Sequence, residues 1–467
     1  MTDAEESSPE AALEHLRASF RGELLDSEHP LYDQARVVWN ARINRRPALI
    51  ARCTGVADVI AAVRFAREQG ALVSVRGGGH DIAGNGVCDG GVVIDISRMK
   101  GARVDPARRT VRAQAGLTWG ELDRETQAFG LATTGGQCSQ TGIAGVTLAG
   151  GIGWLMRRHG LTIDNLLSID LVTADGRFVT ASEHENQELF WGLRGGGGNF
   201  GIVTELELRL HPVQQMVVAI QIYPAERLAD ALRVYQDFAA KEPDGLSSSI
   251  IFIELPELPL LPDHLRGTAG VVLASAYDGP PEEAATLLEP LRALGPPAAE
   301  IFTPLPYLVL QSMFDASPVG AYGYGQCIRS SYMNRLDDAT IDAVVAQMRV
   351  APSPLCLFEM AHIEGAVAQV PEDSTAFPRR AAPFFSMFQA TWRDPVDAER
   401  YTRWTEDAWQ SLERSSYGGT HLGFIDAGEP ESRIREAFGE AKMARLTALK
   451  RAWDPENFFR MNKNIRP

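Results

Sequence analysis

The sequence contains no run of apolar residues long enough to cross a membrane, since none reaches about 18 residues. Positive charge is not in excess either: 45 Lys and Arg stand against 60 Asp and Glu, which gives a net charge of −15. A chain this acidic repels phosphate backbones, so neither nucleic acid nor a membrane is expected as a partner. The N-terminal residues are acidic and lack an apolar core, which predicts no signal peptide and a cytoplasmic location.

Cysteine is scarce, with five residues and no CxxC pair among them. The odd number and the wide spacing exclude a disulfide scaffold and a zinc ribbon. The nine histidines show no metal-ligand spacing, so the sequence predicts no metal site. Three enzyme motifs are also missing: GxxxxGK[ST] of P-loop NTPases, GxSxG of serine hydrolases and HExxH of metalloproteases.

The composition is that of an ordinary globular protein, with 45% hydrophobic and 22% charged residues, and the length allows two or three domains. Its distinctive feature is a set of four glycine clusters, at 77–79, 135–136, 150–153 and 195–198. Glycine lets the backbone approach a ligand closely, and consecutive amide groups in such turns bind anions. Each cluster alone could be a tight turn, but together they predict a large phosphate-bearing ligand.

The first half of the chain alternates short strands and helices. Residues 57–68 carry apolar side chains at helical spacing between strands at 47–53 and 71–75, which predicts a βαβ unit. Gly196, Gly198 and Gly201 match the letters GxGxxG, but they follow a helix and lead into a strand, the reverse of a Rossmann site. Further strands are expected at 92–96, 111–115 and 203–210, helices at 119–128 and 186–193, and a hairpin at 166–180 turning at Asp175-Gly176.

The pattern changes after Pro212. Longer alternating stretches follow at 217–222 and 384–392, with helices expected at 225–240, 281–294, 338–349 and 432–451. This predicts an α+β protein whose second domain is built on an antiparallel sheet. The expected organisation is a flexible tail at 1–10, a first domain at 11–212, a second at 213–430 and a C-terminal segment at 431–467.

Two nucleophilic side chains lie among the glycine clusters. His80 ends the first glycine loop, where it either points at what the loop binds or hydrogen-bonds its own loop. Cys138 lies between Gly136 and Gly142 among exposed amide groups, which would lower the pKa of its thiol and make it reactive. A Cys–His hydrolase or transferase is one interpretation, and a buried small residue is the other.

Five motifs in order resemble one known family. They are RGGGHDIAG at 76–84, GGQCSQTGIAGVTLAGGIGW at 135–154, DNLLSIDLVTADG at 164–176, LFWGLRGGGGNFGIVTELELRLHPV at 189–213 and NKNIRP at 462–467. The chain resembles the berberine-bridge-enzyme-like FAD-linked oxidases of the vanillyl-alcohol-oxidase fold superfamily. The resemblance implies FAD held in a first domain of two αβ subdomains, and a helix-covered antiparallel sheet laid over the flavin. It also implies that the C-terminal segment returns to the FAD-binding domain.

The resemblance also implies covalently bound FAD. His80 stands where the family attaches the 8α-methyl group of the flavin, and Cys138 stands where members with two links attach flavin C6. The cofactor contacts carried over from the family motifs are Arg76, Gly77, Gly78, Gly79, His80, Gly84, Gln137, Cys138, Ser139, Thr141, Gly142, Gly145, Gly150, Gly151, Gly153, Asn199, Gly201, Val203 and Asn464.

The family's catalytic base is where this sequence departs from the pattern. Many relatives carry a Y-x-N-[YF] run with a tyrosine base, and the corresponding run here is His421-Leu422-Gly423-Phe424. His421 is the candidate replacement, because a pKa near 6.5 suits a general base; packing within a strand is the alternative. Gln389 and Tyr324 are candidates for substrate contacts, and Thr141 for oxygen access. Further pocket candidates are Tyr322, Tyr332, Glu359 and His362.

The implied activity is that of an oxidase, which moves a hydride from a substrate C–H bond to flavin N5 and passes the electrons to O2, giving H2O2. Phe384, Phe385, Met387, Phe388 and Phe424 favour a small secondary metabolite as substrate, such as an aromatic compound, a polyketide, an alkaloid or a glycoside. The alternatives are a sugar or oligosaccharide oxidase of the same fold, the Cys138 hydrolase, and a flavin-binding protein without a base. The sequence predicts no oligomeric state.

Overall fold

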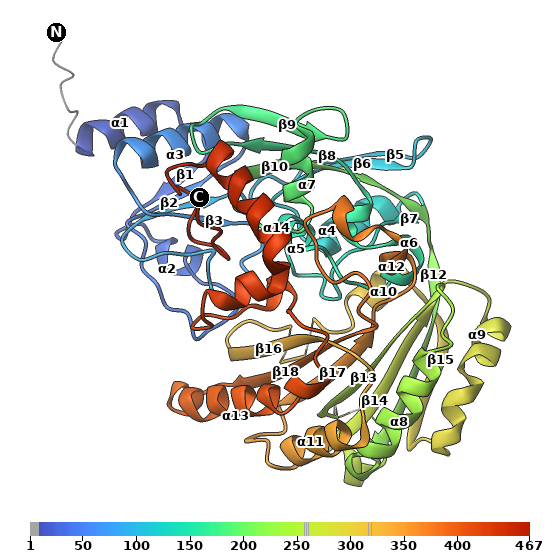
Figure 1. The fold of residues 1–467 in the computed structure, drawn as a ribbon. Coiled ribbons are helices and arrows are strands. Elements are labelled where there is room, and N and C mark those ends of the chain that lie inside the picture. Colours follow the sequence, from blue (N-terminus) through green and yellow to red (C-terminus); the bar gives the residue numbers. More distant parts are fainter. Residues whose placement is uncertain (1–8, 256, 258, 260, 316, 319) are drawn as a thin grey trace.

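The protein is described by a computed structural model in which residues 9–255, 257, 259, 261–315, 317–318 and 320–467 are described. The expected tail at 1–10 lies almost entirely outside these residues, and Pro9 already begins helix α1 (Pro9–Ser19). The chain forms two lobes, one above the other in Figure 1. We call them the α/β lobe, built mainly from residues 9–213 and 430–467, and the large-sheet lobe, built mainly from residues 214–429.

The α/β lobe is built on two small sheets. In the first, the strand order is β1-β2-β4-β3, and β2, β4 and β3 run parallel, with helix α3 returning the chain from β2 to β3 (Figure 1). The second is antiparallel, in the order β5-β6-β10-β8-β9. The bounds are β1 Glu23–Leu25, β2 Leu49–Arg52, β3 Val73–Arg76, β4 Val92–Asp95, β5 Ala102–Asp105, β6 Thr110–Gln114, β8 Leu166–Val172, β9 Phe178–Ser182 and β10 Ile202–Arg209.

The elements predicted for this lobe are confirmed to within a few residues. Helix α3 (Val56–Glu68) gives the expected βαβ unit, and the β8–β9 hairpin turns at Gly176 with a φ of +75°. Helix α4 (Trp119–Gln127) begins with a capping box, in which Thr118 and Glu121 each accept the other's backbone N–H. The remaining elements are α2 Tyr32–Ala35, β7 Leu131–Ala132, α5 Ile143–Ala149, α6 Met156–His159, η1 Thr162–Asp164, α7 Gln187–Leu193, β11 His211–Pro212 and α14 Ser432–Trp453.

The large-sheet lobe contains an antiparallel sheet whose strand order is β15-β12-β14-β13-β17-β18-β16. Helices α8, α11 and α13 cover its outer face (Figure 1), which confirms the predicted helix-covered antiparallel sheet. The bounds of the strands are β12 Gln215–Pro224, β13 Leu246–Glu254, β14 Ala269–Tyr277, β15 Ala299–Pro306, β16 Gly325–Met333, β17 Leu357–His362 and β18 Phe384–Trp392. Those of the helices are η2 Ala225–Arg227, α8 Leu228–Ala239, η3 Asp263–Leu265, α9 Pro281–Leu288, η4 Glu289–Leu294, α10 Tyr307–Gln311, α11 Asp338–Arg349, α12 Ala366–Gln369, η5 Glu372–Ser374, η6 Pro395–Asp397, α13 Ala398–Gln410, η7 Glu413–Ser415 and η8 Leu422–Phe424.

The two faces of the large sheet pack against different partners. On β18, Phe384 and Phe388 lie in the core shared with helices α8, α11 and α13. Phe385 and Met387 lie on the other face, in a cluster with residues of the α/β lobe. Side chains alternate along a strand, so a run of consecutive aromatics cannot line one pocket. The expectation that Phe384 and Phe388 contribute to the substrate pocket is therefore wrong.

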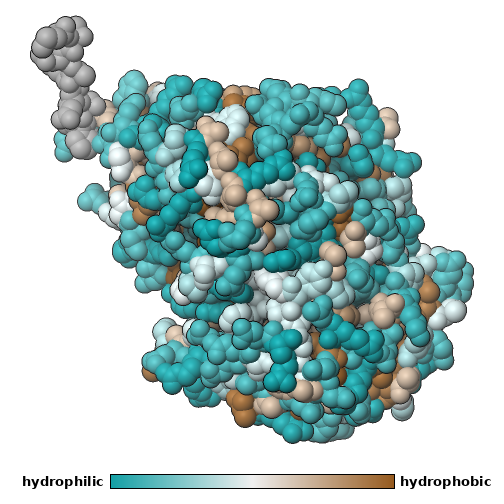
Figure 2. Space-filling view, viewed as in Figure 1, coloured by the Kyte–Doolittle hydropathy of each residue, from teal (hydrophilic) through white to brown (hydrophobic). Residues whose placement is uncertain are grey.

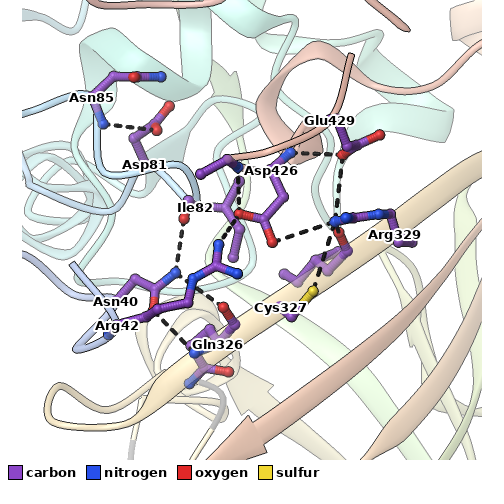
Figure 3. A network of polar contacts seen from close by, with 12 residues as sticks. Asn40, Arg42, Asp81, Ile82, Asn85, Gln326, Cys327, Arg329, Asp426 and Glu429 are labelled. Atoms are coloured by element: carbon purple, nitrogen blue, oxygen red, sulfur yellow. Dashed lines mark hydrogen bonds and ion pairs between the residues drawn. The ribbon is translucent and has the colours of Figure 1, made fainter. Parts of the chain in front are cut away.

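A network of buried polar side chains joins the two lobes (Figure 3). The side-chain amide of Asn40 donates to the backbone oxygens of Ile82 and Gln326, and its oxygen accepts the backbone N–H of Gln326. Beside it, Asp426 is bracketed by the guanidinium groups of Arg42 and Arg329. Because Ile82 lies two residues beyond His80, this network fixes the first glycine loop against the edge of the large sheet.

The last residues of the chain pack into the α/β lobe. The ammonium group of Lys450 is fully buried and donates to the carboxylate of Asp454, at 2.6 Å, and to the backbone oxygens of Asn199 and Phe459. The side chain of Asn199 in turn bonds the backbone of Lys463 and Ile465. Each polar group in this buried cluster is therefore paired, which is the condition for burying charge without a large cost.

The surface in view in Figure 2 is mostly hydrophilic, with apolar residues scattered over it in small groups. Among the described residues, no helix is both long enough and apolar enough to span a bilayer.

Asp454→Ala should lower the free energy of unfolding by about 3–5 kcal/mol, because it leaves the buried Lys450 ammonium without its counter-charge. Chemical denaturation monitored by tryptophan fluorescence measures the change. Glu440→Ala is the matched control: its partner Arg435 lies with it on the surface, where an ion pair contributes about 0–1 kcal/mol. Equal effects of the two substitutions would contradict the assignment.

Candidate active site

Two glycine loops meet backbone to backbone between the lobes. One follows β3 and contains Gly78; the other precedes α5 and contains Gly142. A Cβ atom on Gly78 would lie 2.4 Å from the amide nitrogen of Gly142, and a Cβ on Gly142 would lie 2.5 Å from that of Gly78. Only glycine permits this approach. An open cavity of about 570 Å³ runs along the two loops, with Tyr322 in its wall.

His80 lies at the end of the first loop between two aromatic rings. The ring of Trp39 stacks on it at 5.3 Å, and the ring of Tyr322 meets it edge-on at 5.4 Å. The Nε2 atom of His80 is buried and has no hydrogen-bond partner among the described residues. Burial lowers the pKa of this imidazole to about 4, so it is neutral at pH 7 with a free ring nitrogen.

Cys138 lies in the second loop, which is tied to Asp315. The carboxylate of Asp315 accepts hydrogen bonds from the Sγ of Cys138, at 3.3 Å, and from the backbone N–H and the hydroxyl of Ser139. Burial raises the pKa of the thiol to about 12, and the Asp315 carboxylate adds to the rise. The sequence-based expectation of a lowered thiol pKa is therefore wrong, because burial and a neighbouring anion outweigh the nearby amide groups.

The remaining glycines expected at the cofactor shape the backbone around these loops. Gly84, Gly150 and Gly151 have positive φ, and a Cβ on Gly153 would lie 1.7 Å from the carbonyl oxygen of Gly135. The helical Gly145 instead faces open space. Of the polar residues in this set, Arg76 donates to the carbonyl of Ala35, and Gln137 and Ser139 lie in the Cys138 loop.

Three further residues that the family motifs place at the cofactor also have structural contacts. The side-chain amide of Asn199 forms hydrogen bonds with the backbone of the C-terminal residues, and Val203 is part of the core of the α/β lobe. Gly201 packs closely against Leu171. Asn464, in contrast, keeps a buried side-chain oxygen that has no partner in the described structure.

An aromatic cluster lies between the large sheet and the glycine loops, on the sheet face that turns towards the α/β lobe. His421 has its ring 5.8 Å from that of Phe377, 6.2 Å from that of Phe385 and 5.4 Å from that of Phe424. The ring of Tyr332 lies 6.3 Å from that of Phe377, and its buried hydroxyl has no hydrogen-bond partner among the described residues. The cluster reaches the glycine loops, since a Cβ on Gly150 would lie 2.4 Å from the Phe377 ring and 3.6 Å from His421 Nε2.

His421 does not lie on a strand, as the packing alternative assumed, but caps the short helix η8. Its Nδ1 accepts the backbone N–H of Gly423 at 3.1 Å. A neutral imidazole that accepts at Nδ1 carries its proton on Nε2, which is buried and unpaired here. Burial lowers the pKa of the ring to about 4. His421 is thus a neutral group whose free nitrogen is a hydrogen-bond donor.

The other expected catalytic residues are already engaged. Gln389 is buried and donates to the side-chain oxygen of Gln326 at 2.8 Å. The hydroxyl of Tyr324 accepts from Arg393, away from the aromatic cluster, so Tyr322 and not Tyr324 contacts His80. Thr141 donates to the carbonyl oxygen of Cys138 at 2.8 Å, within the second glycine loop.

Glu359 is the residue whose importance the sequence pattern does not reveal. It lies on β17, beside Ile251 of β13 and Met387 of β18, on the sheet face that turns towards the α/β lobe. No hydrogen bond or charge of a described residue contributes to the pKa of its carboxyl group, and the residue is half-buried. Burial raises its pKa to about 7. A partnerless carboxyl in apolar surroundings is costly, which is typical of a functional group.

The comparisons with known proteins agree with this site. Two family models match the sequence: an FAD binding domain at residues 47–182, and a domain described as berberine and berberine like at residues 421–466. An FAD-linked oxidoreductase of Dictyostelium discoideum is 31% identical over 433 residues, which cover 92% of this chain and 91% of that protein. The chain belongs to the berberine-bridge-enzyme-like FAD-linked oxidoreductases.

Solved structures of such oxidases share the fold. The crystal structure of 6-hydroxy-D-nicotine oxidase from Arthrobacter nicotinovorans matches with a TM-score of 0.86 at 27% identity, covering 96% of this chain and 98% of that one. A chitooligosaccharide oxidase has the same fold, with a TM-score of 0.84 at 24% identity and coverage of 98% and 99%. The predicted α+β, two-domain FAD-linked oxidase fold is thereby confirmed, and the hydrolase interpretation of Cys138 is dropped.

The site of this FAD-linked oxidoreductase suits the cofactor that its family binds. Two glycine loops in backbone contact offer amide groups to a pyrophosphate. Two of the buried atoms without partners among the described residues, His80 Nε2 and Asn464 Oδ1, lie in segments that the family motifs assign to the flavin. Buried polar atoms of native proteins are normally paired, so these free atoms fit a cofactor that would supply the missing hydrogen bond or a covalent bond.

Gly78→Ala should strongly reduce the FAD content of the purified protein, because the new Cβ would push the two glycine loops apart. The ratio of flavin to protein absorbance measures this. Gly55→Ala is the control, since a Cβ there meets nothing within 4 Å and the backbone is extended, with a φ of −170°. Full flavin content in Gly78→Ala would show that the cofactor does not depend on this contact.

Proposed function

We propose that the chain is an oxidase that holds FAD covalently through His80, with Cys138 as a second point of attachment. The observation that carries the proposal is the free, buried Nε2 of His80, held between Trp39 and Tyr322 at the end of a glycine loop. A neutral imidazole with a free nitrogen is a nucleophile, and the two rings fix its orientation. When bound, FAD supplies the hydride acceptor for the substrate and reduces O2 to H2O2.

The lining of the sheet supports an apolar, aromatic substrate rather than a sugar. The side chains that face the α/β lobe include Phe385, Met387 and Phe424, and Gln389 is already bonded within the sheet. The free polar groups at this lining are His421 Nε2, the Tyr332 hydroxyl and the Glu359 carboxyl, which suit one heteroatom of an otherwise apolar substrate better than the many hydroxyls of a sugar. An aromatic secondary metabolite with an oxidisable C–H next to an O–H or N–H group fits this lining.

For the proton that leaves the substrate, Glu359 is the base that we propose. A carboxyl whose pKa lies near 7 is half ionised at neutral pH and so is matched to proton abstraction. His421 would instead donate a hydrogen bond from Nε2 and orient the substrate heteroatom. Thr141, in the loop of Cys138, is the residue that we propose to border the path of O2.

In His80→Ala, the flavin should have no link to residue 80. If Cys138 is also unlinked, denaturation should release the flavin; if Cys138 is linked, the flavin should stay bound through Cys138 alone. Wild-type protein denatured in acid and cleared of small molecules should keep its yellow colour, and peptide mapping should find flavin on the peptide with His80. Flavin that washes out of the wild-type protein would remove the covalent part of the proposal and leave a flavoprotein oxidase.

Glu359→Gln should lower the rate of flavin reduction by about 100-fold or more, the usual contribution of a general base. In the wild-type protein this rate should rise with pH through about 7 and then level off, because only the ionised carboxylate accepts the proton. The variant should lose that rise. Anaerobic stopped-flow reduction of the flavin measures both.

Glu254→Gln is the matched control, since Glu254 lies at the end of β13 and outside the pocket.

Stability gives a second readout. The pKa of Glu359 is raised from 4.5 to about 7 in the folded protein, so stability falls as the pH rises from about 4.5 to about 7 and then stays constant. In flavin-free protein, Glu359→Gln should therefore melt at a higher temperature than the wild type at pH 8, and at about the same temperature at pH 4. A variant that reduces its flavin at the wild-type rate would exclude Glu359 as the base.

A further inference from the structure

Asp315 reaches from one lobe to the other. It lies in the segment between α10 and β16 of the large-sheet lobe, and its carboxylate is bonded to the Cys138 loop of the α/β lobe. One oxygen accepts from Cys138 Sγ at 3.3 Å and from the backbone N–H of Ser139 at 2.9 Å, and the other accepts from the Ser139 hydroxyl. The side chain of Gln140 donates to the backbone oxygen of Asp315, which closes the contact. Asp315 therefore orients the loop as well as the sulfur.

The same carboxylate lies close enough to His80 to act on it. The negative charge of Asp315 opposes the fall in the pKa of His80 that burial causes. Tyr322, whose ring meets His80, is also close enough to Cys138 to interact with it electrostatically. The two residues expected to attach the flavin thus share one neighbourhood, and Asp315 is an acidic group between them.

Because the Cys138 thiol is protonated, it needs a base before its sulfur can bond to carbon. A thiolate forms bonds to carbon, whereas a neutral thiol does so poorly. In this site the thiol is kept protonated by burial and by the neighbouring anion. The sulfur can react at neutral pH only if a base takes its proton as the new bond forms. Among the described residues, Asp315 is the side-chain acceptor that Sγ contacts.

We propose that Asp315 is the base for the second flavin link, taking the proton of Cys138 as its sulfur bonds to flavin C6. This inference rests on the proposed function, because it needs FAD in the site. The sulfur supplies the electron pair of the new S–C6 bond, and the hydrogen on C6 leaves as a proton. The two electrons that remain on the flavin pass to O2, which takes up two protons and leaves as H2O2. One thiol hydrogen and the C6 hydrogen are thus balanced by one H2O2.

The test uses full-length protein made without riboflavin and then given FAD in air. Asp315→Asn keeps a hydrogen-bond acceptor near the sulfur but is not a base. The Cys138–flavin peptide should form about 100-fold more slowly in this variant than in the wild type. Mass spectrometry of digested samples taken over time measures its yield. Raising the pH should restore the rate by about tenfold per unit, because hydroxide then supplies the thiolate.

The His80–flavin peptide from the same samples reports folding and FAD binding, and it should still form in Asp315→Asn. Asp315→Glu should retain much of the wild-type rate, and Asp394→Asn, at an exposed helix cap, is the matched control. Linking at the wild-type rate or faster in Asp315→Asn would overturn the proposal, since the carboxylate would then only hold the thiol protonated. A wild-type protein with flavin on His80 and none on Cys138 would also overturn it while leaving the proposed function intact. A protein that takes up no FAD would remove both.

Discussion

The side chain of Asn40 joins the two lobes at the point where the site is built. It bonds the backbone just beyond His80 on one side and the backbone of Gln326 on the other. Gln326 passes the constraint on, since its side-chain oxygen accepts from Gln389 and Thr391 on the next strand. The glycine loop, the edge of the sheet and its polar inner residues therefore form one connected unit.

Burial without pairing gives this site its chemistry. His80 and His421 are neutral because they are buried, and Glu359 is held near half ionisation for the same reason. The rest of the fold treats buried charge differently, since Lys450 and Asp454 saturate one another and the surrounding backbone. Free buried polar atoms also occur elsewhere in the fold, but at His80 and His421 they coincide with the glycine loops and the aromatic cluster, where a bound cofactor and substrate would complete their contacts.

The sequence predicted the glycine loops and part of the secondary structure, but not strands β13, β14, β15, β16 and β17 of the large sheet. Periods of two and of 3.6 residues, together with turn residues, predicted most elements of the α/β lobe, and the loop motifs led directly to His80 and Cys138. Those features depend on neighbours in the chain. Asp315 does not, because it meets Cys138 across 177 residues and belongs to no motif.

Glu359 and His421 show a second limit of sequence reasoning. Whether a strand residue faces the pocket or the covering helices depends on register, and a shift of one residue exchanges the two faces. Phe384 was for this reason assigned to the wrong face, and Glu359 was given too little weight. His421 is a donor at Nε2 because its Nδ1 accepts the backbone N–H of Gly423. That contact lies in a short helix that the sequence pattern did not predict. Proton positions of this kind are properties of three-dimensional contacts.

The docking of the C-terminal residues also has a consequence for how the protein is made. The side chain of Asn199, in the middle of the α/β lobe, donates to the backbone oxygens of Gly196 and Lys463, and its own oxygen accepts the backbone N–H of Ile465. On the ribosome, the large-sheet lobe is synthesised between these two parts. The contacts around Asn199 are therefore complete only after the residues beyond Lys450 have left the ribosome.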